Sequence, residues 1–77
     1  MVLKRGSSGP EVKILQEQLN TVGVSCDIDG IFGPGTEKAV RTFQTAYGID
    51  SDGMVGEHTR IKLAEALAAA GGGQSAS

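Results

Sequence analysis

An eight-residue pattern occurs twice in this 77-residue chain, and it restricts the possible folds more than any other feature. Residues 29–36 and residues 52–59 both read D-G-x-[FV]-G-x-x-T, so the second copy begins 23 positions after the first. An aspartate can accept hydrogen bonds from its own downstream backbone, while a glycine adopts the positive φ of a tight turn. The repeat therefore predicts one loop-to-helix unit that is used twice.

Three segments of the chain have apolar residues at helical spacing, and each segment begins with a glycine-containing stretch. In the first stretch, apolar residues recur at three- and four-residue spacing after Pro10, and proline suits a first helical turn because its missing N–H would have no helical partner there. The other helices are expected to begin at 33–36 and 56–59, with a glycine ending each of the first two helices. No segment alternates for long enough to predict a strand. The predicted fold is all-α, a three-helix orthogonal bundle with short Gly/Asp-rich loops. Its expected core consists of Val12, Leu15, Leu19, Val40, Phe43, Val55, Leu63 and Leu67.

Length and composition allow one small domain. Residues 1–69 are predicted to form the folded module, and residues 70–77 a flexible Gly/Ser/Ala linker or tail, because this end offers little apolar surface to offset its ordering entropy. The net charge of −2 comes with no basic cluster, which argues against nucleic-acid binding. No apolar run is long enough to span a bilayer, and the start of the chain lacks the apolar segment of a signal peptide. Cys26 is the only cysteine, and no cofactor or metal is expected.

The two loops, together with the L-Q and F-Q pairs on the helices before them, resemble the peptidoglycan-binding domain 1 family. This family is a three-helix module of about this size, and the resemblance covers almost the whole folded unit. Arg60 departs from the pattern, because the family usually has an aromatic residue there, often Trp. The matching positions are Leu3, Gly6, Gly9, Val12, Leu15, Gln16, Leu19, Gly23, Asp29, Gly30, Phe32, Gly33, Thr36, Ala39, Val40, Phe43, Gln44, Gly48, Ile49, Asp52, Gly53, Val55, Gly56, Thr59 and Leu63.

The resemblance implies a non-catalytic module that binds the glycan or stem peptide of peptidoglycan and targets an attached cell-wall hydrolase. A monomer tethered to a catalytic domain is expected. The Met start and the Ala/Gly/Ser end suit the N-terminal module of a phage endolysin, which would stay in the host cytoplasm before release and then act at the cell wall or periplasm. A trimmed bacterial hydrolase and a stand-alone small protein remain open. The alternative function is a protein-interaction or structural domain of the same fold without glycan binding.

The predicted ligand face combines the two repeated loops with the start of the third helix. Glycines let a bulky ligand approach backbone donors, and an arginine offers a forked donor to a carboxylate. In the alternative interpretation, the Asp-Gly turns are architectural, and the amides of Gln16 and Gln44 tie the loops to the helices. The predicted ligand-binding residues are Asp29, Gly30, Thr36, Asp52, Gly53, Thr59 and Arg60.

The loops contain two pairs of closely spaced aspartates, and the sequence supports neither a calcium site nor a glycosidase site at these pairs. Aligning Asp27 and Asp29, or Asp50 and Asp52, with a calcium loop leaves its first and twelfth positions without the anionic ligands that they need. A glycosidase also uses paired carboxylates, but no set of nucleophile, base and orienting group can be assembled from this chain. Turn-forming aspartates are therefore expected here.

Overall fold

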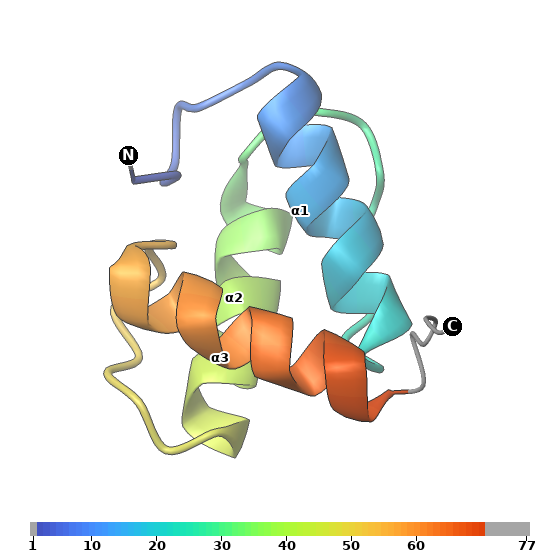
Figure 1. Ribbon diagram of the computed structural model, residues 1–77. Coiled ribbons are helices and arrows are strands. Elements are labelled where there is room, and N and C mark those ends of the chain that lie inside the picture. The colour runs from blue at the N-terminus through green and yellow to red at the C-terminus, as the bar shows by residue number, and fades with distance from the viewer. Residues whose placement is uncertain (1, 71–77) are drawn as a thin grey trace.

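A computed structural model describes residues 2–70 of the chain. It contains α1 (Pro10–Thr21), α2 (Pro34–Ala46) and α3 (Glu57–Ala69), with no strand among the described residues. In Figure 1, α2 runs down the molecule and α3 crosses in front of it towards the lower end of α1. The predicted all-α three-helix bundle is confirmed. The predicted tail falls mainly in residues 71–77, which lie outside the described residues.

Each helix begins directly after a glycine that provides no side-chain cap. Proline occupies the first turn of α1 and of α2, as predicted for α1 from its rigid φ. An acidic residue lies in the first turn of every helix, at Glu11, Glu37 and Glu57, where the positive end of the helix dipole favours it. The helix starts are therefore marked by local features that the sequence displays directly.

The first two helices end in the same left-handed glycine motif. Gly23 has a φ of 93° and Gly48 a φ of 70°. The N–H of the residue after each glycine reaches back five positions, from Val24 to the Leu19 carbonyl at 2.8 Å and from Ile49 to the Gln44 carbonyl at 3.0 Å. This bond, with a second one from the glycine N–H to the carbonyl three positions back, satisfies the last carbonyls of the helix. The predicted glycine stops are confirmed.

The core lies where the three helices meet the two loops. Seven of the eight expected core residues are buried, but Leu67 is only partly buried and packs against the edge of the core. The prediction for Leu67 is wrong because Ala66, one position earlier in the last turns of α3, occupies the inward position instead. The buried apolar side chains are Leu3, Val12, Leu15, Leu19, Phe32, Ala39, Val40, Phe43, Val55, Leu63 and Ala66.

The segment before α1 joins the two repeated loops to each other. Leu3 exchanges backbone hydrogen bonds with Val55 of the second loop, at 3.2 and 2.7 Å. Further along, the Gly6 N–H donates to the Phe32 carbonyl, and the Phe32 N–H donates to the Ser7 carbonyl. The N-terminal segment is thus hydrogen-bonded to both loops through its backbone.

Candidate functional site

A buried glutamine holds the first repeated loop in place. The side chain of Gln16 on α1 has no exposed surface. Its Nε2 lies within 3.0 Å of Asp29 Oδ1, the Ile31 carbonyl and Thr36 Oγ1. Its Oε1 accepts from the backbone N–H groups of Asp29 and Gly30 at 2.9 and 2.8 Å. One side chain therefore replaces the solvent partners that this non-helical backbone would otherwise need.

The second loop repeats this arrangement with Gln44 on α2, which is also fully buried. Its Nε2 lies 3.0 Å from Asp52 Oδ1, 2.8 Å from the Met54 carbonyl and 3.0 Å from Thr59 Oγ1. Its Oε1 accepts from the Gly53 N–H at 2.9 Å. The architectural interpretation of both glutamines is confirmed, and the true repeat therefore includes the helix before each loop.

The turn that each loop aspartate forms lowers the pKa of its carboxyl group. The backbone N–H of Ile31 donates to Asp29 and, with the Gln16 amide, lowers the pKa of that carboxyl. The N–H of Met54 and the Gln44 amide lower the pKa of Asp52 in the same way. Hydrogen bonds to a carboxylate favour its charged form. Each carboxylate is consequently a fixed negative charge within its own turn.

Gly53 is buried by α2. Its φ is 76°, and an added Cβ would lie 2.9 Å from Glu37 Cγ, which is too close for a methyl group. Glu37 also pairs with Arg5 at 3.6 Å and with Arg41 at 3.8 Å. The glycine is required at this position both by backbone conformation and by the close approach of a charged side chain.

The structure distributes five of the seven predicted ligand residues among three separate hollows, and Gly30 and Gly53 line none of the three. Asp29 and Thr36 border a first hollow of about 520 Å³ at the start of α2. Asp52 and Thr59 border a second hollow of about 130 Å³ at the start of α3. Arg60 borders neither of these. The two threonines are only 5% and 6% exposed, and their hydroxyls belong to the glutamine networks.

The two loop hollows are copies of each other made by the repeat. Every residue that borders the second hollow has a counterpart 23 positions earlier that borders the first. The connection from glutamine to aspartate is longer in the first copy, since Gln16 and Asp29 are 13 positions apart, whereas Gln44 and Asp52 are 8 apart. No group of three or more His, Cys, Asp or Glu side chains in residues 2–70 is arranged to hold a metal ion.

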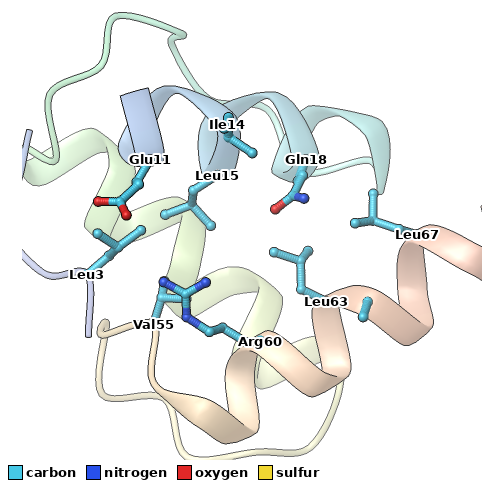
Figure 2. A pocket seen from close by; sticks show the side chains of 10 residues that line it. Leu3, Glu11, Ile14, Leu15, Gln18, Val55, Arg60, Leu63 and Leu67 are labelled. Atoms are coloured by element: carbon cyan, nitrogen blue, oxygen red, sulfur yellow. The ribbon is translucent and has the colours of Figure 1, made fainter. Parts of the chain in front are cut away.

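Arg60 lies in a third and different place, a groove of about 510 Å³ between α1 and α3. Leu15 and Leu63 form its apolar floor, and Figure 2 shows Leu3 and Val55 at one end and Leu67 at the other. We call this feature the α1–α3 groove. Its lining residues are Leu3, Glu11, Ile14, Leu15, Gln18, Val55, Arg60, Leu63, Ala64 and Leu67.

Three polar side chains stand on the walls of the α1–α3 groove. Figure 2 shows Glu11 and Arg60 on opposite walls near the Leu3 and Val55 end, with the Gln18 amide further along the α1 wall. Aliphatic surface with a few placed polar groups is the usual composition of a ligand site. Of the predicted ligand residues, only Arg60 takes part in it.

Sequence reasoning missed the α1 side of the groove. The helix dipole by itself accounts for Glu11, and Gln18 belongs to no motif of the sequence. One signal was available: Ile14 lies off the apolar stripe of α1 and is 51% exposed. An isolated exposed isoleucine is common on proteins, however, so only its place in the groove makes it informative.

Comparison with known proteins agrees with this fold. Residues 8–63 match the family described as "Putative peptidoglycan binding domain". The spore cortex-lytic enzyme of Oceanobacillus iheyensis is 41% identical over 66 residues, which are 84% of this chain and 24% of that enzyme. The crystal structure of the SleB N-terminal domain has a TM-score of 0.81 at 40% identity, with 86% of this chain and 92% of that chain covered. The Burkholderia AP3 phage endolysin has a TM-score of 0.80 at 40% identity, with 82% of this chain and 24% of that chain covered.

The chain thus spans about a quarter of the length of the spore enzyme and of the endolysin. None of its helices within residues 2–70 is long and apolar enough to cross a membrane. The family match covers most of the folded unit, from before α1 into α3, and the three-helix structure agrees with it. The chain therefore belongs to the peptidoglycan-binding domain family.

Proposed function

We propose that this chain is a non-catalytic module that binds peptidoglycan in the α1–α3 groove and targets an attached hydrolase to the cell wall. The observation that carries the proposal is the groove itself, with its apolar floor and its three polar side chains, in a member of this family. Of the predicted ligand residues, the proposal retains Arg60 as a contact. It assigns the six loop residues to the architecture that holds the helices together.

The attached hydrolase is proposed from the relatives. The spore cortex-lytic enzyme and the AP3 endolysin are named as lytic proteins, and each is about four times longer than the region that this chain matches. In this proposal, hydrolysis belongs to the remainder of such a protein, and this module concentrates the enzyme on its polymeric substrate. The similarity to an N-terminal domain supports a position ahead of the catalytic part, and the endolysin similarity supports a phage enzyme as the context.

Weak binding by one module is sufficient for this role. Peptidoglycan offers the same chemical unit many times, so a tethered enzyme that dissociates can rebind to a neighbouring unit before it diffuses away. We expect a monomer, because one groove lies within one chain. The module is expected to act at the cell wall.

Co-sedimentation with purified insoluble peptidoglycan tests the proposal. Ala64 is an exposed alanine on α3 that lines the groove, and Ala68 is an exposed alanine one turn later that does not. Ala64→Phe should fill the groove and abolish pelleting, while Ala68→Phe should leave it unchanged. A folded, unsubstituted chain that stays in the supernatant would refute peptidoglycan binding and favour a protein-interaction domain. Equal pelleting of the two variants would show that binding occurs elsewhere on the module.

A further inference from the structure

The α1–α3 groove also indicates which part of peptidoglycan it binds, provided that the proposed function holds. We propose that the groove takes the stem peptide and not the glycan strand, and that Arg60 binds a stem carboxylate while Glu11 binds a stem ammonium. The ligand class is a short peptide with alanine-sized side chains, a free carboxylate and the free amine of a diamino acid.

The apolar surface of the groove suits a peptide better than a sugar. Proteins commonly place a flat aromatic ring against a sugar face, since such a ring combines apolar area with rigidity. None of the described residues that line the groove is aromatic. Phe32 and Phe43 are buried in the core at 1% and 0% exposure, and the Tyr47 ring packs on Phe43 at 4.5 Å. A pyranose ring, with hydroxyls around its edge, would instead meet leucine, isoleucine and alanine.

The aliphatic floor has the shape and chemistry to receive small methyl-bearing side chains. Leu15 and Leu63 are 3% and 4% exposed, so both side chains are held by core packing and present only a small fixed surface to the groove. Ile14 on α1 stands at the side with half of its surface exposed, and Ala64 on α3 leaves room opposite. Covering Ile14 with an apolar group removes its surface from water, which is favourable in proportion to the area buried.

The charged pair at the Leu3 and Val55 end identifies the polar groups of the ligand. Where stems are attached, the sugars of the glycan strand carry only neutral amide and hydroxyl groups, because the lactyl carboxyl of muramic acid forms the amide bond to the stem. Stem peptides carry free carboxylates and, with a diamino acid, a free amine. Glu11 and Arg60 on facing walls present one negative and one positive group to the same end of the groove. A guanidinium has five N–H donors in a fixed fork, so Arg60 can bind a carboxylate alongside other contacts that it makes within the protein.

Gln18 adds a feature suited to a peptide backbone. Its side chain is half-buried on the α1 wall, and its amide combines a donor and an acceptor. A peptide bond presents the complementary acceptor and donor, so a stem lying along the groove can pair with this amide while its methyl groups face Leu15 and Leu63. The groove volume of about 510 Å³ is within the range of small-ligand sites.

The experiment compares one peptidoglycan preparation before and after an amidase removes its stem peptides. We expect the chain to pellet with intact material that carries diamino-acid stems and to remain in solution with the bare glycan. Soluble stem peptide should shift the methyl resonances of Ile14 and Leu63 in NMR spectra. Equal pelleting with bare glycan would overturn the stem-peptide proposal and leave the proposed function in place. Absence of binding to the intact material would instead remove the proposed function.

Charge-neutral variants identify the residues that carry the recognition. Arg60→Gln should weaken binding of the soluble stem peptide at least about tenfold, the effect expected for a lost charge-assisted hydrogen bond. Its matched control is Lys62→Gln, which removes the same charge from α3 outside the groove. Glu11→Gln should weaken the binding of a stem peptide with a free amine but not the binding of a stem peptide whose amine is acetylated. Glu17→Gln, elsewhere on α1, is its control. An Arg60→Gln variant that binds as tightly as the Lys62→Gln variant would contradict the assignment.

Discussion

Replacing Gln44 with methionine tests whether the second loop depends on one buried amide. Methionine is similar in length and flexible, so the change removes the hydrogen bonds without opening a large cavity. The Gly53 N–H loses its acceptor at 2.9 Å, while the Met54 carbonyl loses its 2.8 Å donor and keeps only the Thr59 hydroxyl at 3.4 Å. Leaving a buried backbone group unsatisfied costs about 1–3 kcal/mol, so the Gly53 N–H alone predicts a loss of about 1–3 kcal/mol.

This loss is large for so small a domain, whose total stability is expected to be roughly 4–10 kcal/mol. Urea denaturation followed by circular dichroism measures the free energy of unfolding, and Tm should fall by at least about 4 °C. Gln18→Met is the matched control, because the Gln18 side chain makes no hydrogen bond within residues 2–70 and the change should stay within about 0.5 kcal/mol. Faster exchange of the Gly53 amide should accompany the loss. A Gln44→Met variant as stable as the Gln18→Met control would refute the role of the amide.

Three further sets of substitutions test the core, the turns and the close approach of Gly53 to α2. Phe43→Ala should cost about 3–5 kcal/mol in urea denaturation because it empties a fully buried site; an unchanged Tm would contradict that burial. The pKa of Asp29 and of Asp52 is lower in the folded chain than in the unfolded chain, so the folded chain binds fewer protons as these carboxyls titrate. Their contribution to the free energy of unfolding is therefore complete above the unfolded pKa of about 4, and it is lost as pH falls through the lower folded pKa. Changing both residues to Asn should reduce the loss of unfolding free energy between about pH 4 and lower pH. An unchanged loss of stability in acid would exclude these two carboxyls as its source. Gly53→Ala should destabilise by at least about 1–2 kcal/mol, while Gly35→Ala inside α2 should stabilise by up to about 1 kcal/mol; effects of the same sign would refute the strain argument.

The helices and their ends were predictable because their signals are local. Pro10 at a helix start and Gly23 at a helix end act through the backbone angles of one or two residues. The spacing of Val12, Leu15 and Leu19 identifies the buried face without knowledge of the partner helix. Leu67 shows where this reasoning weakens, since α3 has no single apolar stripe and the choice between Ala66 and Leu67 depends on how the helix is rotated against α1.

The loop residues illustrate a second limit of sequence reasoning. The sequence favours a ligand-binding role for Asp29, Gly30, Asp52 and Gly53, because the turn is repeated and its glycines let a ligand approach backbone donors. The structure gives each of them a partner inside the fold, through Gln16 in one copy and its counterpart in the other. A repeated motif indicates a repeated physical requirement, and here that requirement is the satisfaction of buried backbone groups. Whether these loops also touch a ligand stays a prediction.

The sequence by itself determined that this chain forms three short helices joined by two equivalent Asp-Gly loops, because glycine conformation, proline, turn aspartates and apolar spacing act over a few residues. The place of the groove was decided only by tertiary structure. Glu11 and Arg60 lie in the first turns of different helices, and nothing local relates them; the packing of α3 against α1 puts them on facing walls. The same packing separates Arg60 from the loop aspartates that precede it closely in the chain, because a helix directs successive side chains to different sides of the molecule.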